Sequence, residues 1–128
     1  MNPQKEGIPM TRDELQAYIN TQFSSIETDY PWVTLPNYMV YRHQSNRKWF
    51  ALVMNISSDK LGLSSTAMLD VLNVKCDPTM IGSLTKEAGI YLAYHMSKAH
   101  WLTIALDGTA SDQTIKMLLD MSFRLTAK

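Results

Sequence analysis

Three histidines and a lysine are the side chains whose types and spacing suggest chemistry. His95 and His100 lie five positions apart with Lys98 between them, and His43 is the only other histidine. A zinc site needs four protein ligands, or three and a water, in tight geometry. We therefore expect no metal and no cofactor, with one histidine bonded to backbone carbonyls and the other facing water. An enzyme using these side chains is the alternative, but no acid, base and nucleophile converge in the sequence.

The single cysteine, Cys76, could act as a nucleophile only beside a base in a partly open, electropositive position. Alternation turns Cys76 inward with Leu72 and Val74, which favours a buried structural thiol. Asp77 precedes Pro78 and is better explained as a helix cap than as a catalytic acid. The chain has no glycine-rich phosphate loop, no Gly-x-Ser-x-Gly elbow and no His-Glu-x-x-His helix. We therefore expect a protein that is not an enzyme.

Two tryptophans are candidates for holding a flat ring. Alternation along three strands places the following residues on one sheet face: Trp49, Ala51, Val53, Asn73, Lys75, Trp101 and Thr103. Two indoles and an ammonium on an open face can stack unpaired bases and contact phosphate. They could equally hold a small aromatic ligand or a partner protein. The alternative is that loops or the N-terminal segment cover the tryptophans as a minor core.

Basic residues are distributed unevenly along the chain. Two acid-free runs, 30–58 and 88–106, contain Arg42, Arg47, Lys48 and Lys98. If these side chains project together they form a modest basic edge, which could make roughly 3–4 phosphate contacts and bind DNA weakly and with salt sensitivity. The alternative is that a solvent-exposed turn happens to be basic.

Length and composition limit the possible classes of protein. The 128 residues (14.6 kDa) fit one domain, 1–128, with a loose N-terminal tail at 1–10. Twelve Lys and Arg balance twelve Asp and Glu, which excludes a nucleic-acid clamp that relies on bulk charge. No apolar run approaches the ~20 residues of a membrane span, and the polar start is unlike a signal peptide. A lone cysteine suits a reducing compartment, so we expect a cytoplasmic monomer.

The apolar spacing predicts three helices and five strands. The expected helices are 12–24, 77–87 and 111–122, and the expected strands are 38–43, 49–56, 69–76, 90–94 and 101–106. The segment 28–37 is expected to be extended or looped, and 57–66 to be a surface loop. In the second strand we expect the alternate residues Phe50, Leu52, Met54 and Ile56 to face the core. Tight turns make consecutive strands antiparallel.

The order α-β-β-β-α-β-β-α therefore predicts an α+β two-layer sandwich, in which an antiparallel sheet carries its helices on one face. Four blocks of sequence then show a family resemblance: Lys48-Trp49-Phe50-Ala51-Leu52-Val53, Asn73-Val74-Lys75-Cys76-Asp77-Pro78, Ala93-Tyr94-His95-Met96 with Lys98 and His100-Trp101, and Leu118-Leu119 with Ser122-Phe123. Through these blocks the chain from Asp29 to Thr126 resembles the MmcQ/YjbR family.

This resemblance implies a fold similar to that of CyaY, the bacterial frataxin homologue. It also implies a double-wing arrangement thought to bind DNA. Iron handling in the resembling fold depends on an acidic helix ridge, and the first helix here offers only Asp13, Glu14 and later Glu27. We therefore expect a binding module, with DNA as the favoured partner and a small aromatic ligand as the alternative. The predicted binding residues are Arg42, Arg47, Lys48, Trp49, Lys75, His95, Lys98, His100 and Trp101.

Overall fold

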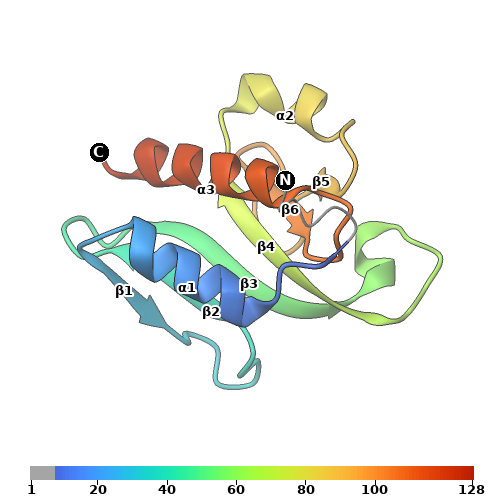
Figure 1. Ribbon diagram of the computed structural model, residues 1–128, viewed down its shortest axis with the longest axis horizontal. Helices are drawn as coiled ribbons and strands as arrows, with labels where there is room; N and C mark the ends of the chain where they lie inside the picture. Colours follow the sequence, from blue (N-terminus) through green and yellow to red (C-terminus); the bar gives the residue numbers. More distant parts are fainter. Residues whose placement is uncertain (1–7) are drawn as a thin grey trace, which may run out of the picture.

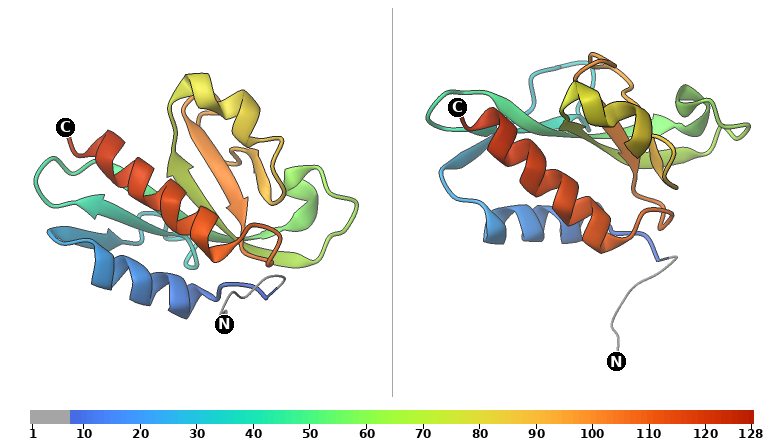
Figure 2. Two further views of the ribbon diagram at one scale, coloured as in Figure 1. Left: turned by 45° about the horizontal axis from the view of Figure 1, so that its top comes forward. Right: turned by 90° about the horizontal axis from the view of Figure 1, so that it is seen from above.

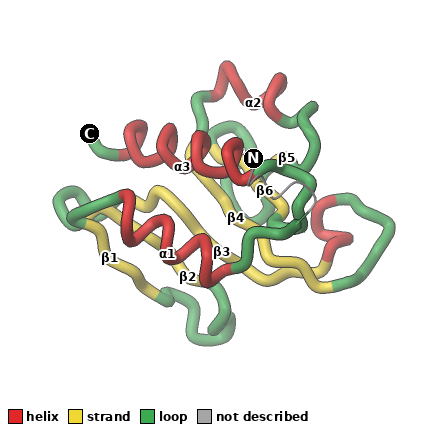
Figure 3. Tube along the Cα trace, viewed as in Figure 1, coloured by secondary structure: helices red, strands yellow, loops and turns green. Residues whose placement is uncertain are grey.

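A six-stranded antiparallel sheet forms the centre of the molecule (Figure 1; the elements are distinguished in Figure 3). The computed structural model describes residues 8–128. Within this range the helices are α1 (Arg12–Gln22), α2 (Pro78–Leu84) and α3 (Asp112–Thr126), with a 3-10 turn at Ser58–Leu61. The strands are β1 (Ile26–Asp29), β2 (Met39–His43), β3 (Trp49–Ser57), β4 (Met68–Lys75), β5 (Ile90–Leu92) and β6 (Trp101–Ala105), in the spatial order β1-β2-β3-β4-β6-β5.

The predicted α+β sandwich is confirmed, with one strand more than the sequence pattern indicated. Strand β1 is only four residues long, so its alternation is too short to recognise. Helix α3 continues to Thr126, beyond the expected end near Ser122. A loose tail was predicted at 1–10, and residues 1–7 of it lie outside the described residues. Met10, at the end of this segment, is part of the core. None of the described helices is long and apolar enough to cross a membrane.

The helix starts follow from local side-chain chemistry. Thr11 and Glu14 form a capping box at α1, each side chain pairing with the backbone N–H of the other. Asp77 accepts a hydrogen bond from the N–H of Thr79 at the start of α2, and this bond lowers the pKa of the Asp77 carboxyl. Ser111 caps α3 in the same way. The predicted role of Asp77 as a cap is confirmed.

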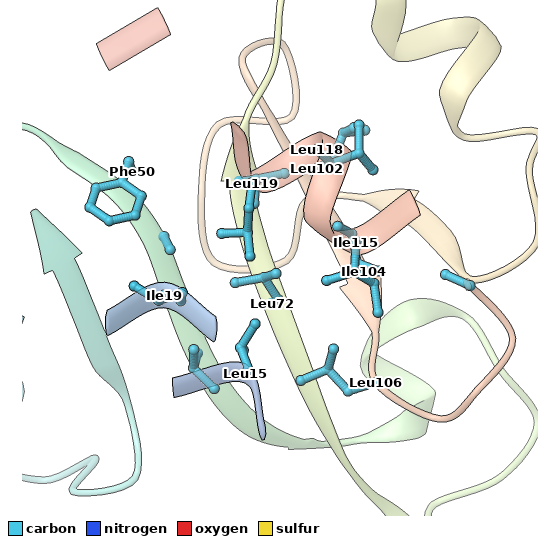
Figure 4. Close-up of a cluster of buried hydrophobic side chains, with 14 of the residues drawn as sticks. Leu15, Ile19, Phe50, Leu72, Leu102, Ile104, Leu106, Ile115, Leu118 and Leu119 are labelled. Carbon is cyan, nitrogen blue, oxygen red and sulfur yellow. The ribbon is translucent and has the colours of Figure 1, made fainter. Parts of the chain in front are cut away.

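The main core lies between the sheet and the helices, with α1 and α3 on the same face (Figure 2). Figure 4 shows its centre, where helical side chains meet side chains of the sheet: Leu15, Ile19, Phe50, Leu72, Leu102, Ile104, Leu106, Ile115, Leu118 and Leu119. Helix α2 contributes Ile81 and Leu84 to the same cluster. The predicted inward faces of β4 and β6 are therefore correct. Cys76 belongs to this core, and burial raises the pKa of its thiol, as expected for a structural cysteine.

A β-bulge reverses the expected faces of β3. Arg42 pairs with Trp49, whereas the preceding Tyr41 pairs with Ala51, so Phe50 is an extra residue on β3. Phe50 and Ala51 both face the helices, and the alternation beyond them is inverted. As a result the residues predicted inward at Leu52, Met54 and Ile56 lie on the opposite face, and those predicted outward at Ala51 and Val53 lie in the main core. Both sets are apolar, so the sequence pattern could not distinguish them.

Ser122 of α3 completes the sheet where the bulge interrupts it. The backbone N–H of Lys75 donates to Ser122 Oγ at 2.8 Å, and Ser122 Oγ donates to the carbonyl of Phe50 at 2.6 Å. The hydroxyl thus stands between β3 and β4, where a direct strand-to-strand bond is missing. Ser122 is completely buried, so neither backbone group has water as a substitute partner.

We expect Ser122→Ala to destabilise the fold by about 1–3 kcal/mol, because it leaves a buried N–H and a buried carbonyl unpaired. The measurement is the free energy of unfolding in urea. Ser83→Ala, at an exposed serine of α2, is the control and should change stability by less than about 0.5 kcal/mol. Equal losses in the two variants would contradict the bridging role of Ser122.

His43 attaches the last turn of α3 to the end of β2. Its Nε2 lies 2.8 Å from Thr126 Oγ1, and its ring lies between Phe50 and Phe123 at centroid distances of 5.3 and 4.4 Å. Only 4% of the residue is exposed. Burial lowers the pKa of His43, with the positive charge of Lys48 acting in the same direction.

The lowered pKa of His43 predicts a loss of stability in acid. The unfolded chain takes up the proton first as pH falls, so this contribution is complete above about pH 6.5 and is lost below it. The free energy of unfolding measured from about pH 7.5 to 5 should therefore decrease more in the wild type than in His43→Phe. His100→Gln, at an exposed histidine, should retain the wild-type slope. A His43→Phe profile parallel to that of the wild type would show that His43 does not cause the loss.

Candidate ligand-binding face

The face of the sheet opposite α1 and α3 carries a second, smaller core. Its buried residues come from β2, β3 and β4 and from the position directly before β2: Tyr38, Val40, Leu52, Met54, Ile56 and Val71. Half-buried side chains from the connecting loops pack on it: Trp32, Leu35, Leu61, Tyr94 and Met96, with Trp49 of β3 and Leu69 of β4. Loops therefore cover part of this face, as the alternative of a minor core anticipated. The bulge at Phe50 is what turns the apolar residues of β3 toward these loops.

Five rings gather on this second core, and we call them the outer aromatic cluster: Trp32, Tyr38, Trp49, Tyr94 and His95. Trp32 is central, with ring centroids 5.6 Å from Trp49, 5.9 Å from Tyr38 and 5.0 Å from His95, all in edge-to-face geometry. His95 also contacts Tyr38 at 5.5 Å and Tyr94 at 6.1 Å. Trp32 and Trp49 are half-buried and His95 is exposed, so the cluster is fixed by packing and still reaches the surface.

Buried polar side chains of the sheet hold the loop that carries His95. Asn73 Nδ2 donates to the carbonyl of Tyr94 at 2.8 Å, and the Tyr94 N–H donates to Thr103 Oγ1 at 2.9 Å. Thr103 Oγ1 in turn donates to Asn73 Oδ1 at 2.6 Å. Lys98 Nζ donates to the carbonyl of Ala93 at 2.9 Å. The loop is therefore anchored immediately before His95, whose backbone has a φ of +74°.

Trp101 and Lys75 form a separate pair. They are cross-strand neighbours on β6 and β4, and Lys75 Nζ lies 5.5 Å from the centre of the indole ring. Only 7% of Trp101 is exposed, so it does not form an open wall beside Trp49 as the sequence pattern predicted. Trp49 instead contacts Trp32, a loop residue. Alternation along the strands does not show which loop covers each ring.

The arginines of the predicted basic edge are paired with carboxylates of β1. Arg42 Nε lies 2.8 Å from Glu27 Oε1, and its Nη1 lies 3.2 Å from Asp29 Oδ2. Arg47 also forms an ion pair with Glu27. The hydrogen bond that Arg42 donates to the Glu27 carboxylate raises the pKa of Arg42. Glu27 and Asp29 lie just before the acid-free run 30–58 in the sequence. Antiparallel pairing of β1 with β2 brings them next to the arginines.

The remaining predicted residues lie at other places. Lys48 Nζ donates to the main-chain oxygen of Lys128, beyond the end of α3, at 2.8 Å. His100 is exposed, and its carbonyl accepts from the N–H of Cys76. No group of three or more His, Cys, Asp or Glu side chains in residues 8–128 is arranged to hold a metal ion. Among the nine predicted residues, the structure therefore joins Trp49 to His95 through Trp32, Lys75 to Trp101, and Arg42 to Arg47 through Glu27.

Sequence reasoning missed three members of the outer aromatic cluster: Trp32, Tyr38 and Tyr94. Trp32 follows Pro31 in a segment predicted to be a loop, and nothing in its spacing shows that the loop folds back over the sheet. Two signals were available, namely the aromatic content of 30–38 and the position of Tyr94 beside His95. Neither signal predicts which rings join the cluster unless the inverted register of β3 is known.

The chain is thus a small α+β protein that carries α1 and α3 on one face of an antiparallel sheet and an aromatic cluster on the other. The YjbR family model matches residues 21–125, and the chain belongs to this family. The family predicted from the four sequence blocks is thereby confirmed. The chain is 38% identical over 117 residues to the uncharacterised protein YyaQ of Bacillus subtilis (strain 168), covering 91% of this chain and 98% of YyaQ.

Solved structures show the same fold. The crystal structure of a Pseudomonas syringae protein is 40% identical and matches with a TM-score of 0.87, covering 91% of this chain and 99% of that one. A solution NMR structure from the same organism gives a TM-score of 0.81, also at 40% identity, covering 91% and 93% of the two chains. Deinococcus radiodurans DR2400 shares the fold at 24% identity with a TM-score of 0.71, covering 95% of this chain and 83% of DR2400.

We expect Thr103→Val to release the loop before His95, because the Tyr94 N–H loses its acceptor and Asn73 loses a donor. The loss of stability should be about 1–3 kcal/mol. Hydrogen exchange at the Tyr94 amide should become markedly faster. Thr66→Val, at an exposed loop position, is the control and should change neither quantity. Unchanged exchange at Tyr94 in Thr103→Val would contradict the anchoring role.

Proposed function

We propose that this YjbR-family protein is a non-enzymatic binding module whose contact surface is the outer aromatic cluster, and that its partner is single-stranded DNA. The observation that carries the proposal is the edge-to-face contact of Trp32 with Trp49 and His95 on a face that loops only partly cover. Preorganised rings at a surface stack unpaired bases with little ordering cost, and every base offers a flat face. Duplex DNA conceals those faces, so we expect single strands to bind better.

The distribution of charge supports weak rather than strong phosphate binding. Arg42 and Arg47 share Glu27, which reduces the net positive charge they offer to a phosphate. Lys98 donates to a neutral carbonyl and forms no ion pair with a carboxylate in residues 8–128. Lys48 is exposed and directly precedes Trp49. Two lysine contacts would give a slope of log affinity against log salt of about −1.4 for a single strand.

A small aromatic ligand is the second candidate, and the same ion pairs favour it. If Glu27 and Asp29 cancel the charge of Arg42 and Arg47, ring stacking becomes the main attraction that this face offers. A neutral aromatic compound would then bind with almost no dependence on salt, whereas DNA binding would weaken as salt rises. Salt dependence therefore separates the two candidates.

Tryptophan fluorescence during titration with a short single strand tests the proposal. We expect Trp49→Ala to weaken binding about tenfold, in line with the loss of one base-stacking contact. Trp101→Phe alters an enclosed ring outside the cluster and should leave affinity unchanged. The double variant Arg47→Ala, Lys48→Ala should weaken all sequences alike, with a reduction of about 0.7 in the salt slope for each charge that contacts phosphate.

Three outcomes would count against DNA as the partner. The first is a wild-type protein that binds no single strand at low salt. The second is a folded double variant, Arg47→Ala, Lys48→Ala, with wild-type affinity and salt slope. The third is Trp49→Ala binding as well as Trp101→Phe. Salt-independent binding of a neutral aromatic compound that is lost in Trp49→Ala would instead establish the second candidate.

A further inference from the structure

His95 occupies a backbone conformation that side chains rarely adopt. Its φ of +74° lies in the left-handed region, which costs most residues other than glycine about 1 kcal/mol or more. Ser25 and Arg47 are the other described non-glycine residues with positive φ. The hydrogen bonds of Tyr94 to Asn73 and Thr103 hold the chain in place just before this position. A glycine would adopt the same φ without strain, so the presence of an imidazole at this position requires an explanation.

Packing holds the ring of His95 in position, but its nitrogens form no hydrogen bond within residues 8–128. Three rings contact it, from Trp32, Tyr38 and Tyr94. No hydrogen bond joins either ring nitrogen to a partner within residues 8–128, whereas Nε2 of His43 is bonded to Thr126. Because His95 is exposed, its polar edge is available to a molecule that stacks on the neighbouring indoles.

We propose that His95 recognises the hydrogen-bonding edge of a heteroaromatic ring stacked on Trp32 and Trp49, and that protonation of its imidazole strengthens binding to rings whose edges carry acceptors. This inference rests on the proposed stacking function and adds the class of ring that the site prefers. Imidazole is the side chain that changes charge between about pH 5 and 8. A charged donor makes a stronger hydrogen bond to a carbonyl acceptor than a neutral one.

His95 faces two phenols and an indole, and Lys98 lies on the same loop. Burial raises the pKa of the Tyr38 phenol above its ordinary value. Lys98 donates to the Ala93 carbonyl. No carboxylate in residues 8–128 forms an ion pair with His95. His100 is the other histidine of the loop and provides a matched control.

The test is a fluorescence titration with short oligothymidylate, whose bases carry carbonyl acceptors, at about pH 5.5 and about pH 8. An abasic strand of equal length separates base recognition from phosphate contact. We expect the wild type to bind oligothymidylate about fivefold more tightly at the lower pH. His95→Asn keeps a residue that tolerates positive φ but cannot titrate, so its affinity should not change with pH. His100→Gln should behave like the wild type.

Each result supports or overturns the assignment. A pH effect that persists in His95→Asn, or that is equally large for the abasic strand, would overturn recognition of a base edge by His95. Wild-type binding that Trp49→Ala abolishes but that does not change with pH would also overturn it, while leaving the proposed stacking function intact. Absence of any wild-type binding to oligothymidylate at either pH would refute the proposed DNA function itself. His95→Gly, which fits the backbone without strain, should be at least as stable as the wild type and should also lack the pH effect.

Discussion

The extra residue on β3 is the constraint on which both faces of the molecule depend. One insertion at Phe50 places two successive side chains on the helical side and inverts every position beyond them. The backbone groups that the bulge separates are joined through the hydroxyl of Ser122, so a residue of α3 takes part in the sheet. The packing of α3 on the core and the register of β3 therefore depend on each other. The contact between His43 and Thr126 joins the sheet to the end of the same helix.

The inverted register explains why the outer face can support a binding site. Leu52 and Met54 are buried apolar residues on this face, and the loops bearing Trp32 and His95 pack against it. The network of Asn73 and Thr103 fixes the second of these loops through hydrogen bonds to backbone rather than through ring packing alone. Aromatic rings held in this way lose little freedom when a ligand binds, which is the physical basis for proposing recognition on this face.

Much of the architecture could be predicted from the sequence, and particular residues show where prediction ended. The helix cap at Asp77 could be predicted because capping is a local signal, and Thr11 and Ser111 cap their helices through the same local chemistry. The faces of β4 and β6 followed from alternation, but β3 is apolar on both sides, so only the bulge decides its orientation. The acid-free run 30–58 suggested a free basic edge, whereas pairing of β1 with β2 brings Glu27 to Arg42 and Arg47. Trp32 belongs to the outer aromatic cluster through a loop path that spacing does not encode.

The most direct test of this account is a heteronuclear NMR titration that follows the three indole N–H signals as single-stranded DNA is added. Trp32 and Trp49 belong to the outer aromatic cluster, while Trp101 is enclosed beside Lys75 and acts as an internal reference. The account predicts that the Trp32 and Trp49 signals shift together, with the amides of 93–98, and that the Trp101 signal moves little. Shifts confined to the β2–β3 turn around Arg47, or largest at Trp101, would contradict it.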